Sequence, residues 1–115
     1  MLQELKMNDG FKDRQKGYEA KYQQDQEMLF KITARKNKLL GLWAAEQMGL
    51  NEEAAKAYAS EVVVADFEEP GDADVVRKVM GDLSNKGFDI SEQSLRKQMD
   101  VLGDAARQQI ENEKI

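Results

Sequence analysis

The stretch A-E-Q-M-G-L-N-E, residues 45–52, decides the fold of this chain. It ends a long pattern of apolar residues at helical spacing, and a glycine just beyond such a pattern usually takes the left-handed conformation that terminates a helix. Gly49 is therefore expected to end one helix, with Leu50 folding back on Ala45. Asn51 can then cap the next helix through its side-chain oxygen. The stretch predicts a tight turn between two helices.

Further breaks in the sequence mark out the other helices. Pro70 lacks a backbone donor and disfavours the helical conformation of the residue before it, so the second helix must end before this proline. Asp72 and Ser91 suit the N-cap positions of a third and a fourth helix, and Gly87 is placed to end the third. The sequence predicts an all-α four-helix bundle in residues 29–113, with helices at about 29–48, 52–67, 72–86 and 91–112.

The apolar residues of these segments recur at helical spacing and define the expected core. Trp43 is the only tryptophan and is interpreted first as a core anchor, while Gly41 marks a close approach of two helices. The first helix is expected to bury Leu29, Ile32, Leu39, Leu40, Trp43 and Ala44. The third is expected to bury Val75, Val76, Val79, Met80 and Leu83, and the fourth Leu95, Met99, Leu102, Ala106 and Ile110.

The composition excludes several classes of function. The 115 residues fit one domain of ordinary size. Because cysteine and histidine are absent, there is no disulfide framework, no thiolate metal site and no imidazole for acid–base catalysis. A net charge of −5 does not favour binding to nucleic acid. No apolar run reaches the length of a membrane span, and residues 1–10 lack the apolar stretch of a signal peptide, so we expect a soluble cytoplasmic protein.

Residues 1–28 differ from the rest of the chain, because they hold few aliphatic residues and many charged residues and glutamines. Phe11, Tyr18, Tyr22 and Leu29 are spaced by 7, 4 and 7 residues, which places them within about 20° of one line on a helix. Such a narrow stripe suits a groove on a partner. One interpretation is a segment that is mobile when free and becomes helical on its partner. The alternative is a simple extension of the first helix.

Charge is unevenly distributed along the chain, and two clusters of opposite sign stand out. They either face each other inside the protein and orient its helices, or one of them faces a partner and steers docking. The acidic cluster does not match a calcium-binding loop, so we expect neither a metal site nor a catalytic site there. The basic collar comprises Lys31, Arg35, Lys36 and Lys38, and the acidic patch comprises Asp66, Glu68, Glu69, Asp72 and Asp74.

Two stretches carry a more specific signal than any of these patterns. They read A-R-K-N-K-L-L-G-L-W-A-A-E-Q-M-G at residues 34–49 and V-V-A-D-F-E-E-P-G-D-A-D-V at residues 63–75. Together they resemble the zeta subunit of alphaproteobacterial F-type ATP synthase, a family of ATPase inhibitors. The resemblance runs from about Gly10 to Ile110. It implies a four-helix bundle carrying an N-terminal inhibitory segment, residues 1–28 here. The resemblance further implies that this segment inserts between the alpha and beta subunits of the catalytic head and blocks rotation in the direction of hydrolysis.

The resemblance also assigns residues to partner binding. The family's basic turn, which contains an asparagine, matches Arg35, Lys36, Asn37 and Lys38. The family's N-terminal motif matches Phe11, Asp13, Arg14, Tyr18, Glu19, Lys21 and Tyr22. These residues include the aromatic stripe, so both lines of reasoning place the partner surface at the same end of the chain.

The leading hypothesis is thus an inhibitor of ATP hydrolysis without enzymatic activity. Its expected partners are the alpha, beta and gamma subunits of the catalytic head, which place it in the cytoplasm, peripheral to the inner membrane. We expect a monomer when free, no nucleic-acid partner and no resident cofactor. Two alternatives stay open. One is a sensor that binds ADP or ATP in a pocket between helices near Trp43, Arg77 and the acidic loop, and the other is a helical adaptor for another complex.

Overall fold

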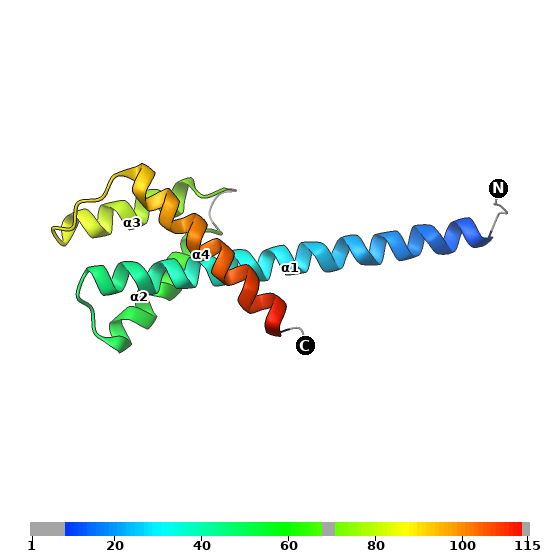
Figure 1. Cartoon of the computed structure of the whole chain (residues 1–115), viewed down its shortest axis with the longest axis horizontal. Coiled ribbons are helices and arrows are strands. Elements are labelled where there is room, and N and C mark those ends of the chain that lie inside the picture. The colour runs from blue at the N-terminus through cyan, green and yellow to red at the C-terminus, as the bar shows by residue number, and fades with distance from the viewer. Residues whose placement is uncertain (1–8, 68–70, 114–115) are drawn as a thin grey trace. The chain divides into compact units, whose positions relative to one another are not determined.

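A computed structural model of the chain describes residues 9–67 and 71–113, with side chains from Gln26 onward. Four helices follow one another along these residues (Figure 1). The expectation of an all-α fold with four helices is confirmed. No helix in this part of the chain is both long enough and apolar enough to cross a membrane. The helices are α1 (Asp9–Gln47), α2 (Glu52–Ala65), α3 (Ala73–Asn85) and α4 (Glu92–Glu113).

The first helix begins at Asp9, twenty residues earlier than the Leu29 start that the sequence predicted. Residues 9–28 contain no proline, and their lysines and glutamines favour a helix, while Gly10 and Gly17 lower the helix propensity without ending the helix. The backbone therefore follows the alternative in which the segment extends the first helix. The chain divides into two compact units, Met1–Lys31 and Ile32–Ile115, and the second contains the apolar core. A separate inhibitory role for residues 1–28 stays a prediction.

The turn between α1 and α2 forms as the sequence predicts. Gly49 has a φ of 76°, which side chains other than glycine rarely allow. Its N–H donates to the carbonyl of Glu46 at 3.1 Å, and the N–H of Leu50 donates to the carbonyl of Ala45 at 3.0 Å. These two bonds satisfy carbonyl groups that the end of a helix would leave unpaired. The Asn51 side chain then accepts the Ala54 N–H at 2.8 Å and caps α2.

The end of α3 repeats this arrangement. Gly87 has a φ of 82°, and the N–H of Phe88 donates to the carbonyl of Leu83 at 2.9 Å. The predicted cap of α4 is also present, since Ser91 Oγ accepts the Ser94 N–H at 3.1 Å. Local hydrogen bonds therefore determine both the turn between α1 and α2 and the turn between α3 and α4.

Two predictions around the second and third helices need correction. The second helix ends at Ala65 rather than at about residue 67. Asp72 does occupy the N-cap position of α3, but its side chain makes no capping hydrogen bond. The carboxylate is instead an acceptor for Lys36 Nζ at 3.3 Å. An ion pair with a different helix has replaced the local cap.

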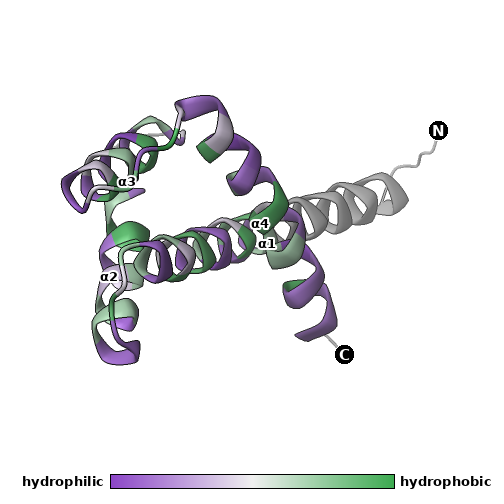
Figure 2. Ribbon diagram, turned by 60° about the vertical axis from the view of Figure 1, so that its left-hand side comes forward, coloured by the Kyte–Doolittle hydropathy of each residue, from purple (hydrophilic) through white to green (hydrophobic). Residues whose placement is uncertain are grey.

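The core lies within the second unit and draws apolar side chains from all four helices. Along α3 and α4 these residues alternate with hydrophilic ones on the outer faces (Figure 2). Leu29 is a correction, because it is 58% exposed and precedes the unit that holds the core. Leu39, Trp43, Met80 and Leu102 are only partly buried. The central buried cluster contains Leu40, Ala44, Ala45, Tyr58, Val62, Val75, Val76, Val79, Leu83, Leu95 and Met99.

Gly41 allows α1 and α2 to approach closely, as expected from its place inside a helix. A Cβ atom added to Gly41 would lie 2.5 Å from the Cα of Ala59, which no real contact permits. The backbones of the two helices therefore touch at this level. Their spacing depends on the absence of a side chain at residue 41.

Gly41→Ala should destabilise the protein by about 1 to 2 kcal/mol, because overpacking at a helix contact costs more than the gain of about 1 kcal/mol in helix propensity. The measurement is the free energy of unfolding in urea. Gly81→Ala is the matched control: a Cβ at Gly81 in α3 meets nothing within 4 Å, so it should stabilise by about 0.5 to 1 kcal/mol. Equal effects of the two substitutions would show that the close approach is unimportant.

Candidate functional site

The N-terminal residues that the sequence assigns to partner binding fall in α1. Their backbone is helical, but the side chains lie outside the described residues. By helical register, the aromatic stripe shares one line with Leu29. Leu29 is 58% exposed. The residues concerned are Phe11, Asp13, Arg14, Tyr18, Glu19, Lys21 and Tyr22.

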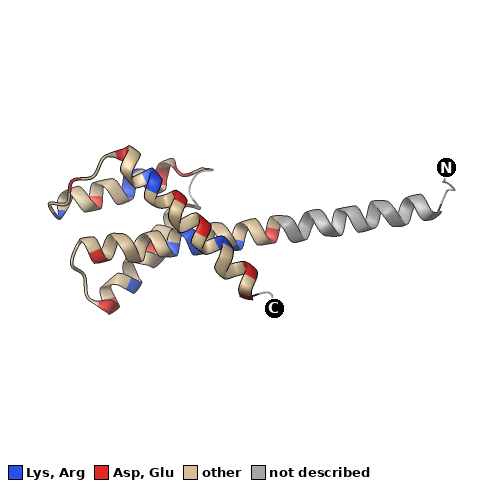
Figure 3. Cartoon of the chain, in the orientation of Figure 1, with Lys and Arg blue, Asp and Glu red and all other residues tan. Residues whose placement is uncertain are grey.

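The four side chains of the basic turn, residues 35–38, lie in four different environments. Successive helical residues differ in direction by about 100°, so four in a row cover the whole circumference of the helix. Arg35 reaches α4, where its Nη1 donates to Gln109 Oε1 at 2.7 Å and lies 2.7 Å from Glu113 Oε2. Figure 3 shows the basic residues of α1 gathered where α4 crosses that helix.

Lys36 connects three helices. Its Nζ lies 3.3 Å from both carboxylate oxygens of Asp72 at the start of α3. Its aliphatic stem packs against α4, where a Cβ on Gly103 would lie 3.3 Å from Lys36 Cδ. The interpretation that the basic collar and the acidic patch face each other inside the protein is confirmed for this pair. Such a partly buried ion pair, supported by packing of the stem, contributes more than an exposed one.

Asn37 is the buried member of the turn, with 1% of its surface exposed. Neither its Nδ2 nor its Oδ1 has a hydrogen-bond partner. A buried amide without partners costs about 1 to 3 kcal/mol. The sequence analysis grouped Asn37 with the partner-binding residues of the turn. Its burial became visible only from the packing of the other helices around it.

Asp66, at the C-terminal end of α2, is a partly buried carboxyl group near Asn37. Burial raises the pKa of the Asp66 carboxyl, and the negative charges of Asp72 and Asp74 raise it further. The positive charge of Lys36 and the nearby Asn37 amide lower this pKa, but they do not outweigh the burial. A carboxylate at the C-terminus of a helix also meets the negative end of the helix dipole. The ionised form of Asp66 is therefore destabilising in the folded protein.

Lys38 lines a groove between α1 and α2. The groove has a volume of about 630 Å³, which is within the usual range for ligand sites. Apolar side chains form most of its wall, and a lysine from each helix borders it. The lining residues are Lys38, Leu42, Lys56, Ala59, Ser60, Val63 and Val64.

Trp43 and Arg77, which the sequence suggested for a nucleotide, do not line this groove. Trp43 packs against the core and meets the Phe88 ring edge to face, with ring centroids 6.4 Å apart. Arg77 is exposed on α3 and forms an ion pair with Asp74 one turn earlier in the same helix. The described contacts of both residues are therefore structural.

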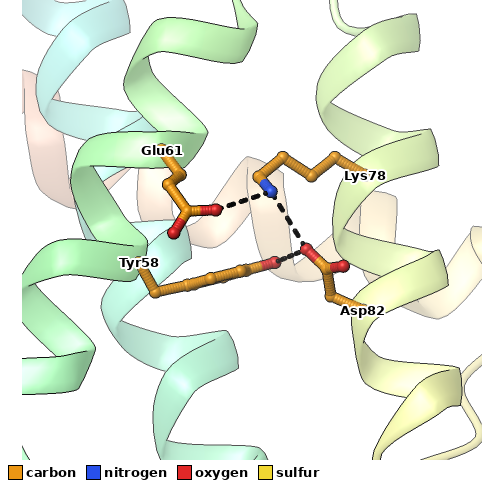
Figure 4. A network of polar contacts seen from close by, with 4 residues as sticks. All are labelled: Tyr58, Glu61, Lys78 and Asp82. Carbon is orange, nitrogen blue, oxygen red and sulfur yellow. Dashed lines mark hydrogen bonds and ion pairs between the residues drawn. The ribbon is translucent and has the colours of Figure 1, made fainter.

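A polar network joins α2 to α3 (Figure 4). Tyr58 Oη donates to Asp82 Oδ2 at 2.8 Å, and Lys78 Nζ donates to the same oxygen at 3.2 Å and to Glu61 Oε1 at 3.1 Å. The Lys78 ammonium also lies 5.1 Å from the centre of the Tyr58 ring. The two helices are thereby tied together by a charged group, a carboxylate and an aromatic ring.

The network changes the acidity of its members. Burial raises the pKa of the Tyr58 hydroxyl, and the hydrogen bond to Asp82 raises it further. Burial lowers the pKa of Lys78, but the hydrogen bonds to Glu61 and Asp82 outweigh this and leave its pKa raised. Both groups keep their protons at neutral pH. The network is therefore a fixed connection between helices and not a proton relay.

Sequence analysis missed both this network and the groove. Lys78 and Asp82 are four residues apart on one helix, a spacing typical of ion pairs, so half of the network was visible in the sequence. The pairing with Tyr58, and the groove residues Lys56 and Val64, depend on which helices become neighbours. Nothing in the local sequence carries that information.

The described residues hold no group of three or more acidic side chains that could bind a metal ion. Those of the acidic patch that the structure describes interact with other side chains, as Asp72 does with Lys36 and Asp74 with Arg77. The polar groups of the site hold helices together, and its open feature is a groove suited to a protein surface or an apolar ligand.

The fold and these contacts define the class of small all-α proteins with four helices packed around one apolar core. The family model of the ATPase inhibitor subunit zeta matches residues 7–109. The chain therefore belongs to the ATPase inhibitor subunit zeta family, and it is a regulator rather than an enzyme. Membership in the family implies binding to F-type ATP synthase.

A solved structure supports the same fold. A protein whose structure was determined by solution NMR is 49% identical to this chain and superposes with a TM-score of 0.67. The match covers 75% of this chain and 98% of that protein. No curated protein matches the chain.

Tyr58→Phe should destabilise the protein by about 1 to 2 kcal/mol at pH 7, because it removes a hydrogen bond to a carboxylate. An unfolded tyrosine ionises near pH 10, whereas the raised pKa keeps folded Tyr58 protonated. The wild type therefore loses stability as the pH rises above about 10, and the gap between the two proteins should narrow there. Urea unfolding from pH 7 to 11 measures this, and a constant gap would contradict the role of the hydroxyl.

Asp66→Asn should stabilise the protein at pH 7 by less than about 1 kcal/mol. Because the folded pKa of Asp66 is raised, ionisation is unfavourable in the folded state, and the penalty is relieved as the pH falls through that pKa. The advantage of the variant should therefore vanish toward pH 4. Asp104→Asn, at an exposed residue of α4, is the control and should change little. An advantage of Asp66→Asn that persists at pH 4 would contradict the electrostatic cause.

Proposed function

We propose that this chain inhibits ATP hydrolysis by F-type ATP synthase through its N-terminal segment. In this proposal residues 1–28 enter an interface between an alpha and a beta subunit of the catalytic head. The inserted helix then blocks rotation of the gamma subunit in the direction of hydrolysis. The observation that carries the proposal is the register of α1, which places Phe11, Tyr18 and Tyr22 in line with the exposed Leu29.

The aromatic stripe supplies the binding free energy in this proposal. Burying one large aromatic side chain contributes about 1.5 to 3 kcal/mol. The charged residues on either side of the stripe then fix the orientation of the helix in the cleft. Because the backbone is already helical from Asp9 onward, less conformational entropy is lost on docking than for a disordered segment. The charged residues are Asp13, Arg14, Glu19 and Lys21.

The second unit, Ile32–Ile115, serves as a body too large to enter the cleft. Its helices are tied by the ion pair of Lys36 with Asp72 and by the Tyr58 network. A body held together in this way resists deformation when the catalytic interfaces open and close. In this proposal the protein lies in the cytoplasm, peripheral to the inner membrane through its attachment to the synthase.

The double substitution Phe11→Ala and Tyr18→Ala should reduce inhibition of ATP hydrolysis at least tenfold, because two anchors of the stripe are lost. The measurement is the concentration of the protein that halves hydrolysis by the cognate catalytic head. Circular dichroism should show unchanged helix content.

Lys16→Ala combined with Gln24→Ala is the matched control. By helical register both residues lie on the side of α1 opposite the stripe, so this variant should inhibit as the wild type does. Unchanged inhibition by the stripe variant would overturn the role of the aromatic anchors. A wild-type chain that leaves hydrolysis unaffected would overturn the proposal as a whole.

A further inference from the structure

The groove between α1 and α2 has no role in the mechanism proposed above. Its α2 wall consists of Lys56, Ala59, Ser60, Val63 and Val64, which follow the spacing of one helix face over about two turns. Val64 is 58% exposed, although it is apolar and belongs to this wall. The face therefore carries an apolar strip that is open to solvent at Val64, whereas Ala59 is buried against α1 and Lys56 and Ser60 are its polar members.

The two lysines lie at opposite ends of the groove. Helices α1 and α2 run in opposite directions after the tight turn at Gly49, and Gly41 faces Ala59 across the contact. Lys38 precedes Gly41 by three residues and Lys56 precedes Ala59 by three. On antiparallel helices these offsets point in opposite directions, so the lysines are separated by about 9 Å along the groove.

Both lysines are available to a partner, in contrast to their basic neighbours. Arg35 and Lys36 are held by Glu113 and Asp72. Lys38 makes no ion pair with a described residue. Among the described residues, Lys56 forms an ion pair with Glu52 alone, at 3.9 Å, and the Lys56 side chain is 72% exposed. An exposed pair at that distance contributes little and is easily exchanged for another carboxylate.

From this geometry we infer that the groove is a second docking surface, which receives an amphipathic helix on the catalytic head of the F-type ATP synthase. That helix carries an apolar stripe of about two turns with a carboxylate near each end. A pair of carboxylates seven residues apart spans about 10 Å, which matches the separation of the lysines. The inference rests on the proposed function and adds a contact made by the second unit to the one made by residues 1–28.

Other occupants fit this surface less well. A second copy docking through the same groove by twofold symmetry would bring Lys38 and Lys56 against their own counterparts, and like charges repel. Nucleic acid requires many more cations, and the chain carries a net charge of −5. The groove has no aromatic side chain on which a nucleotide base could stack.

The test is the affinity of the full-length chain for the immobilised cognate catalytic head during ATP hydrolysis. Lys38→Glu combined with Lys56→Glu should weaken binding at least tenfold, while inhibition at saturating protein stays at the wild-type level. Lys97→Glu combined with Arg107→Glu makes the same change of charge at exposed residues of α4, away from the groove. This control should bind as the wild type does.

A second pair of variants tests the apolar strip without changing charge. Val64→Ser should weaken binding several fold, whereas Val101→Ser, at a residue of α4 that is 60% exposed, should have no effect. Both residues are exposed, so both variants should keep the wild-type circular dichroism and thermal unfolding. This pair keeps the inference falsifiable if the charge reversals disturb folding.

The outcomes separate this inference from the proposed function. If the wild type inhibits and both groove variants bind as their controls do, the docking surface is wrong and the inhibitory mechanism stands. If the wild type neither binds nor inhibits, both are wrong. Sedimentation velocity tests whether the groove binds a second copy of the chain. A wild-type dimer that Lys38→Glu and Lys56→Glu convert to a monomer would assign the groove to a second copy and overturn the inference.

Discussion

One turn of α1, residues 35–38, determines how the second unit holds together. Because successive residues differ in direction by about 100°, their side chains reach different parts of the unit. Arg35 contacts α4, and Lys36 contacts both α3 and α4. Asn37 is buried in the interior, and Lys38 lines the groove. The apolar core is built largely from valine and alanine, so these polar contacts are a substantial part of what fixes the helices relative to one another. The close approach at Gly41 lies in the next turn of the same helix.

Local chemistry made the turns predictable. Gly49, Asn51, Gly87 and Ser91 act through neighbours within a few residues, and each does what its type and position indicate. Prediction was wrong where a distant residue intervened. Asp72 is the clearest case, because Lys36 takes the carboxylate that a local cap would have used. The early start of α1 has another cause: composition suggested weak order, yet no residue in the segment breaks a helix.

The candidate site shows the same division. The sequence grouped Arg35, Lys36, Asn37 and Lys38 into one basic surface, because it contains no information about which neighbour each side chain meets. In the structure two of the cations are engaged in ion pairs within the unit, one residue is buried and one cation is left at the surface. For a regulator that binds another protein, the unpaired cation matters more than the total charge of the turn. The groove could not be predicted, since it exists only where two helices meet.

The contact of Trp43 with Phe88 has a practical consequence. Trp43 is the only indole in the chain, so tryptophan fluorescence, excited selectively over that of tyrosine, comes from a single position. The ring of Phe88 belongs to the turn that ends α3, and its edge-to-face packing on Trp43 joins that turn to α1. Emission from the native chain is therefore a spectroscopic signal for the closure of the helices around the core, and it can be followed without attaching a dye.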